Sequence, residues 1–118
     1  ATLRGGAPFG RGCRFTRENN IHTWLVAHPS KFLIKGQKRD VPTLYDIADS
    51  AHFYNKADYG VVVYRPDDES SRVELHIQKV RFYTTGKKGV AGLNYDVSAG
   101  RYEESNYVNN ERSNEYAY

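Results

Sequence analysis

The feature that most limits how this chain can fold is the apolar run at residues 21–27, Ile-His-Thr-Trp-Leu-Val-Ala. The run ends in consecutive apolar residues instead of an alternating pattern, which is typical of a strand covered on both faces, as in parallel α/β sheets. Pro29 follows, and because proline cannot donate to a sheet ladder, the strand is expected to end at His28. The sequence therefore predicts an α/β fold with parallel central strands.

The segment before this run predicts little regular structure. Residues 1–12 are rich in glycine and show no periodicity, so residues 1–14 are expected to be a disordered or unrelated junction segment. Residues 14–20 are polar, with one aromatic, and resemble the last turns of a helix that stops at Asn19 or Asn20.

The segments after the run predict antiparallel hairpins. A short helix is expected at 50–58, a second buried strand at 60–64, and a longer strand at 73–82 joined to it by a turn. A last hairpin is expected between 90–95 and 100–102. The main body is therefore residues 15–102, and the polar residues 103–118 are expected to be a disordered tail.

Composition narrows the class of protein. The chain has 118 residues, 39% hydrophobic and 26% charged, which suits one globular domain or part of one. It has no apolar run long enough to span a membrane, no secretory signal, and a single cysteine, so a cytoplasmic location is expected. The formal charge of +3 suits a nucleic-acid partner, and it suits a basic domain that binds none equally well.

His28 is the first candidate for a functional residue. Ligands of open α/β sheets bind beyond the carboxyl ends of the strands, and His28 follows such an end. A histidine there can donate a hydrogen bond to a phosphate oxygen and so sense whether the phosphate is present. The alternative is a histidine that only caps the sheet against solvent.

Lys79 and Arg81 are the second candidate. Side chains alternate along a strand, so positions two apart share a face at a separation of about 6.6 Å. Leu75 and Ile77 lie on the same expected face, so its first part should be buried while its end carries two cations outward. That arrangement can present an arginine finger to a phosphate. A solvated strand end is the alternative.

The lysine-rich stretch at 30–45 and the following turn are a third candidate, because lysines and backbone N–H groups contact phosphates without reading sequence. A merely solvated loop is the alternative. A metal site is not expected, because the histidines and Cys13 lack the spacing of metal ligands. The sequence also contains no Gly-x-x-x-x-Gly-Lys-[Ser/Thr] phosphate loop.

Five segments in order resemble the DnaB and Twinkle-type replicative DNA helicases, particularly the phage primase-helicase branch. They are residues 17–31 with Ala-His-Pro, 45–58, 60–65, 76–82 with Lys-x-Arg-Phe, and the closing hairpin at 92–102. The resemblance covers about residues 15–102. It implies the C-terminal portion of a RecA-like P-loop NTPase core, with the phosphate loop and the metal-holding acidic strand further upstream.

The resemblance also implies functional roles. His28 corresponds to the family's phosphate sensor, Arg81 to the arginine finger that reaches the ATP of a neighbouring subunit, and Lys79 to the lysine beside it. ATP and Mg²⁺ are the implied cofactors, and single-stranded DNA and a homo-oligomeric ring, expected to be a hexamer, are the implied partners. The residues implied to line the DNA channel are Lys31, Lys35, Lys38, Arg39, Ala48, Asp49, Ser50 and Ala51.

One departure from the family concerns the expected Ser-Gly-Ser turn, where this chain has Ala48-Asp49-Ser50. Asp49 lacks the backbone freedom of glycine, which weakens the case for close approach to DNA at this turn. A non-catalytic nucleic-acid-binding or interaction module derived from the same fold is the alternative function. On the helicase interpretation, the isolated chain is expected neither to bind nor to hydrolyse ATP.

Overall fold

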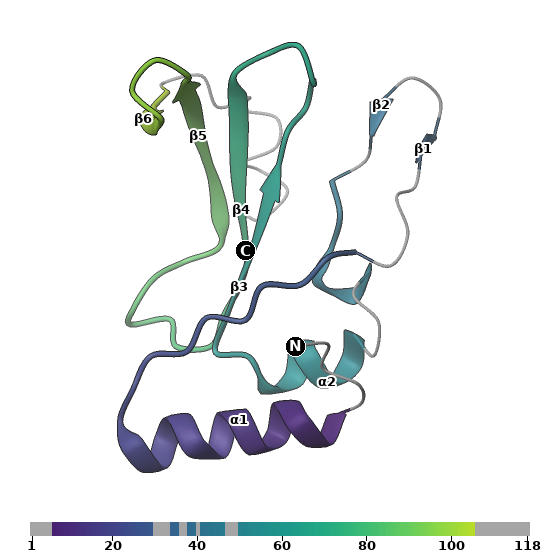
Figure 1. Ribbon diagram of the computed structural model, residues 1–118. Coiled ribbons are helices and arrows are strands. Elements are labelled where there is room, and N and C mark those ends of the chain that lie inside the picture. The colour runs from purple at the N-terminus through teal and green to yellow at the C-terminus, as the bar shows by residue number, and fades with distance from the viewer. Residues whose placement is uncertain (1–5, 30–33, 36–37, 40, 47–49, 106–118) are drawn as a thin grey trace.

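The computed structural model describes residues 6–29, 34–35, 38–39, 41–46 and 50–105. Two helices pack together at one end of a twisted sheet (Figure 1). In chain order the elements are α1 (Gly6–Asn19), β1 (Ile34–Lys35), β2 (Lys38–Arg39), the 3-10 helix η1 (Leu44–Asp46), α2 (Ser50–Lys56), β3 (Tyr59–Tyr64), β4 (Arg72–Val80), β5 (Gly89–Asp96) and β6 (Arg101–Glu104).

The main sheet has four strands in the order β3-β4-β5-β6, and each neighbouring pair is antiparallel. The hairpins expected at 60–82 and 90–102 are therefore confirmed, and the short helix expected at 50–58 is α2. The last strand continues to Glu104, beyond the predicted start of the polar tail at residue 103. Residues 106–118 of that tail lie outside the described residues.

The prediction of a central parallel strand at residues 21–27 is wrong for this segment. Residues 21–29 form no regular secondary structure, and the segment leaves Trp24 78% and Val26 86% exposed. A strand with two apolar faces needs a partner strand for its backbone and cover for both faces. Within the part of the chain that the structure describes, no strand pairs with it.

The prediction for residues 1–14 is corrected as well, because Gly6–Asn19 form the helix α1 and only residues 1–5 lie outside the description. Contacts between residues one turn apart support this helix: Arg14 and Glu18 form an ion pair at 2.7 Å, and Thr16 Oγ1 donates to the Gly12 carbonyl oxygen. The helix ends where the sequence predicts, since Asn20 has a φ of 51° in the left-handed region typical of helix ends.

The two faces of the main sheet differ from the usual arrangement of polar and apolar groups. Directly opposed residues share a face, so the pair Val63 and Leu75 and the pair Tyr64 and Glu74 lie on opposite faces. Val63 is 63% exposed, whereas Tyr64 and Glu74 are 6% and 3% exposed. The prediction that the first part of the face with Leu75 and Ile77 is buried holds only in part, because Val73 on that face is 3% exposed but Leu75 and Ile77 are half-buried.

A β-bulge interrupts the pairing of β3 with β4 and gives β4 an unusual distribution of side chains. Gly60 pairs with Lys79 but Val61 pairs with Ile77, so Gln78 is the extra residue on β4. In a regular strand, consecutive side chains point to opposite faces. Here Gln78 bonds to η1 and its neighbour Lys79 bonds to α2, two elements that pack against each other. The bulge thus directs two consecutive polar side chains to one layer.

Gly60 lies beside this bulge, and a side chain at this position would have to displace the Leu44 side chain. A Cβ atom at position 60 would overlap the Leu44 Cδ1 atom, whereas a Cβ at Gly89 on β5 would meet no atom within 4 Å. We expect Gly60→Ala to lower the free energy of unfolding by about 0.5–1.5 kcal/mol, because the Leu44 side chain must leave its preferred rotamer to make room. Gly89→Ala should be neutral or slightly stabilising, and denaturant unfolding of both variants measures the difference. Equal effects of the two substitutions would contradict this packing.

Candidate functional site

Lys79 and Arg81, at the end of β4, both contact the helix α2. Lys79 Nζ donates to the carbonyl oxygen of Tyr54 in α2 and lies 4.8 Å from the centre of the Tyr54 ring. Arg81 donates from one terminal nitrogen to the carbonyl oxygen of Asn55 at 2.6 Å and from the other to Asp58 Oδ1 at 2.7 Å. The prediction that both cations leave β4 on one side agrees with these contacts.

These bonds cap the C-terminus of α2. The last carbonyl groups of a helix have no partner within the helix, and they carry the partial negative charge of the helix dipole. Lys79 and Arg81 bond to the carbonyl oxygens of Tyr54 and Asn55, so they supply both the missing hydrogen-bond donors and the positive charge that offsets the helix dipole. The same two groups that suit a phosphate are therefore already engaged by carbonyl oxygens of their own chain.

The surroundings of Lys79 weaken its hold on a proton. Partial burial lowers the pKa of the Lys79 ammonium, the nearby charge of Arg81 lowers it further, and the carboxylate of Asp58 opposes both effects. The Arg81 side chain is 28% exposed, and a guanidinium offers paired N–H donors that match two phosphate oxygens. Of the two cations, Arg81 is thus the more suitable contact for an anion.

Aromatic and amide contacts hold η1 against α2 and against the end of β4, where the two cations lie. The Tyr45 ring in η1 stacks on the Tyr54 ring in α2 with 4.7 Å between centroids. The Gln78 side chain accepts from the Leu44 backbone N–H at 3.0 Å and donates to the Pro42 carbonyl oxygen at 2.8 Å. Burial raises the pKa of the Tyr45 hydroxyl, with an added contribution from Tyr54.

The structure does not bring His28 into this group by any described contact. His28 lies in the irregular segment after α1, is exposed, and forms no hydrogen bond to another described residue. Its role as a phosphate sensor stays a prediction.

The expected DNA-channel residues are only partly described. Lys31, Ala48 and Asp49 lie outside the described residues. The backbone of the antiparallel pair β1 and β2 contains Lys35, Lys38 and Arg39, so part of the expected loop is a small hairpin, drawn apart from the main sheet in Figure 1. Ser50 and Ala51 begin α2, directly before the residues that Lys79 and Arg81 cap.

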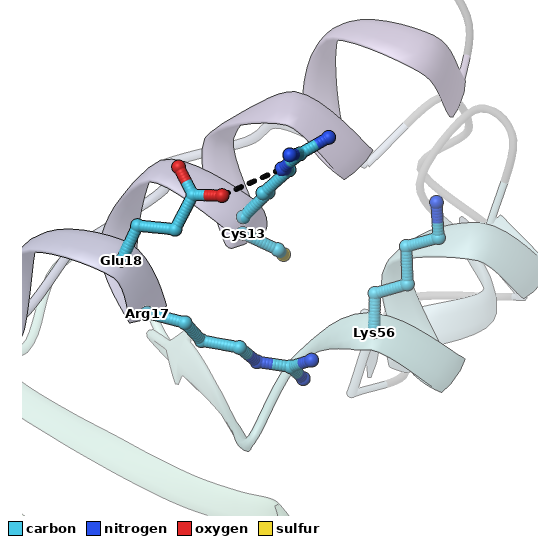
Figure 2. A pocket seen from close by; sticks show the side chains of 5 residues that line it. Cys13, Arg17, Glu18 and Lys56 are labelled. Carbon is cyan, nitrogen blue, oxygen red and sulfur yellow. Dashed lines mark hydrogen bonds and ion pairs between the residues drawn. The ribbon is translucent and has the colours of Figure 1, made fainter.

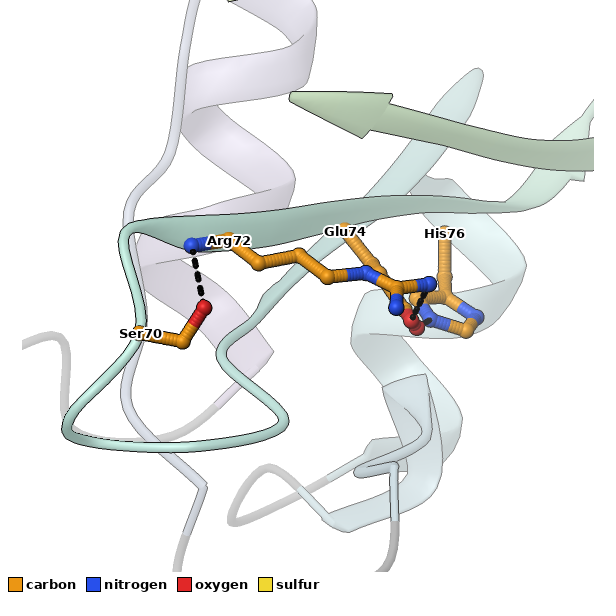
Figure 3. A network of polar contacts seen from close by, with 4 residues as sticks. All are labelled: Ser70, Arg72, Glu74 and His76. Carbon is orange, nitrogen blue, oxygen red and sulfur yellow. Dashed lines mark hydrogen bonds and ion pairs between the residues drawn. The ribbon is translucent and has the colours of Figure 1, made fainter. Parts of the chain in front are cut away.

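A buried charged network on β4 is a feature that the sequence analysis missed. Arg72 donates to Glu74 Oε1 at 3.2 Å, and His76 Nε2 lies 2.9 Å from Glu74 Oε2, as Figure 3 shows. Glu74 and His76 are 3% and 0% exposed, and the Tyr64 ring packs edge-on against His76 at 5.9 Å. The alternation Arg-x-Glu-x-His was the available signal, because it places three ionisable groups on one strand face.

Comparison with known proteins identifies a similar protein. Over 96 residues, 78% of this chain, the sequence is 40% identical to the Twinkle homolog protein, chloroplastic/mitochondrial, of Arabidopsis thaliana. The chain spans 13% of the length of that protein. No protein-family model matches the chain. No solved structure matches it either.

This similarity supports the DnaB-like helicase family as the class of protein to which the chain is related. The relation to Twinkle-type helicases was expected from the ordered motifs, and the similarity supports it at that level. The RecA-like fold, the cytoplasmic location and the roles of single residues stay predictions. Among the described residues, no helix is long and apolar enough to cross a membrane.

Proposed function

We propose that this chain is the C-terminal part of the ATPase core of a ring-shaped replicative DNA helicase. The observation that carries the proposal is the 40% identity to a Twinkle homolog protein over 78% of the chain. The parent protein would couple ATP hydrolysis to movement along single-stranded DNA, and its ATP sites would lie between subunits of a homo-oligomeric ring.

The geometry of β4 supports a particular division of labour. Arg81 would contact the terminal phosphate of ATP held by a neighbouring subunit, with Lys79 beside it, because both cations lie at the same end of one strand. An arginine placed in this way stabilises the charge that develops on the transferred phosphoryl group. His28 would report the phosphate in its own subunit, and the residues before α2 and at its start would hold the DNA backbone.

The described residues fit only part of an ATP site. Lys79 and Arg81 suit phosphate oxygens, but no group of three or more His, Cys, Asp or Glu side chains in the described ranges could hold a metal ion. The sequence also lacks a phosphate loop. In the proposed helicase, the groups that hold Mg²⁺ and the nucleotide phosphates would therefore come from other segments.

The absence of a phosphate loop gives a direct test. We expect the purified 118-residue chain to show no ATP hydrolysis, and the longer protein that contains it to separate duplex DNA in an ATP-dependent reaction. Phosphate release and a fluorescent strand-displacement assay measure the two activities. Turnover by the isolated chain that is abolished by substitution of Lys79 or Arg81 would refute this division of labour.

A further inference from the structure

A second group of cations lies between α1 and the C-terminal end of α2, the helix end that Lys79 and Arg81 cap. Cys13, Arg14, Arg17 and Glu18 from α1 and Lys56 from α2 line a pocket of about 390 Å³ (Figure 2). This volume is within the range of about 300–1,000 Å³ that is usual for small-ligand sites. The pocket thus has the size of a ligand site and walls from two elements.

The charges around this pocket do not balance. Three cations and one carboxylate line it, so its formal charge is 3 − 1 = +2. Arg14 is paired with Glu18 at 2.7 Å, but Arg17 and Lys56 form no ion pair or hydrogen bond with any described side chain. Within the described residues nothing compensates these two cations, so they repel each other across the pocket, and an anion between them would remove that repulsion.

The orientation of the side chains favours a ligand between the helices. Figure 2 shows the Arg17 side chain extending from α1 toward α2, with the Cys13 thiol on the same side of α1. Arg17 and Lys56 both lie in the last turn of their helices, where a cation offsets the partial negative charge of the helix end. That role explains why each residue is basic, but it does not explain why both line one pocket.

We propose that this pocket binds a phosphate group, with Arg17 and Lys56 as the two direct contacts and Arg14 at the rim. A guanidinium offers paired donors that match two oxygens of a phosphate, and an ammonium on the opposite wall offers a point charge to a third oxygen. The phosphate can belong to a nucleic-acid backbone or to a small phosphate compound. The inference does not rest on the proposed helicase function, because that function gives no role to Arg17 or Lys56.

The single cysteine of the chain makes the proposal testable at the pocket itself. Cys13 is partly accessible and lines the pocket, so its alkylation by iodoacetamide reports on this place alone. In experiments on the whole chain, we expect a bound phosphate group to slow the alkylation of Cys13, compared with sodium chloride at the same ionic strength. Inorganic pyrophosphate and an oligothymidylate are the two probes, and the one that protects Cys13 identifies the source of the phosphate.

Matched variants distinguish a specific phosphate contact from a general effect of positive charge. Arg17→Gln and Lys56→Gln should each weaken protection by roughly tenfold or more in probe concentration, because each removes one charged hydrogen bond. Arg101→Gln, at an exposed arginine on β6 that is 70% accessible, should leave protection unchanged. Arg17→Lys keeps the charge and should retain part of the protection, which guards against a loss caused only by misfolding.

Two outcomes would overturn the proposal. One is that neither probe protects Cys13 beyond the sodium chloride control. The other is that protection persists undiminished in the Arg17→Gln and Lys56→Gln proteins, while circular dichroism shows that both remain folded. Either result would assign Arg17 and Lys56 to the helix ends alone.

Discussion

Replacement of Arg81 by alanine in the full-length protein is expected to lower the rate of ATP hydrolysis by about 10³- to 10⁵-fold. The proposed reason is that Arg81 stabilises transition-state charge on the nucleotide of a neighbouring subunit. ATP binding should be much less affected than turnover, because this interaction strengthens as the phosphoryl group is transferred. Steady-state phosphate release, with nucleotide binding measured separately, tests the prediction.

The capping of α2 by Arg81 requires a control, because the alanine substitution also removes bonds to Asn55 and Asp58. Asp58→Ala removes the ion pair at 2.7 Å and leaves Arg81 in place, so turnover should stay within about tenfold of the unmodified protein. Arg101→Ala serves as a surface-charge control. If Asp58→Ala abolishes turnover as fully as Arg81→Ala does, the guanidinium acts through α2 and not on a phosphate.

The second large effect is expected at the buried network of β4. Glu74→Ala should lower the free energy of unfolding by about 3–5 kcal/mol, which is the usual cost of breaking a buried charged pair by removal of one partner. The substitution takes an acceptor from both Arg72 and His76, in a place where Glu74 is 3% exposed. Denaturant unfolding measures the change, and Glu74→Gln should lose less because it keeps an acceptor oxygen.

The chain contains a matched control for this prediction. Arg101 and Glu103 form an ion pair with the same spacing along a strand and the same distance of 3.2 Å, but their side chains are 70% and 56% exposed. An exposed pair of this kind contributes about 0–1 kcal/mol, so Glu103→Ala should change stability little. If Glu74→Ala and Glu103→Ala have similar effects, burial does not set the strength of the Arg72–Glu74 interaction.

The hairpins could be predicted from the sequence because their signals are local. Gly60 followed by three valines, the turn before Arg72 and the closing turn after Asp96 each combine strand-forming and turn-forming residues within a few positions. Asp96 shows why such a turn is well defined: its carboxylate accepts from the Ser98 hydroxyl at 2.6 Å and the Ser98 N–H at 2.9 Å. These bonds lower the pKa of Asp96.

The run at residues 21–27 could not be placed by the same reasoning, because its pattern describes the environment of a strand and not its partner. Leu25 and Val26 remain exposed here, with 41% and 86% accessible. The position of Lys79 and Arg81 on one side was predictable from alternation, but their bonds to α2 were not. Those bonds depend on the bulge at Gln78 and on a helix that precedes the strand in the chain.

The capped end of α2 has a thermodynamic consequence for any anion that approaches β4. Such an anion competes with the carbonyl oxygens of Tyr54 and Asn55 for Lys79 and Arg81. A helix of seven residues has little stability of its own, so withdrawal of these cations loosens a helix whose first residue is Ser50. Linkage is reciprocal: a ligand that fixes the Ser50 end of α2 must change the affinity for the anion by the same factor.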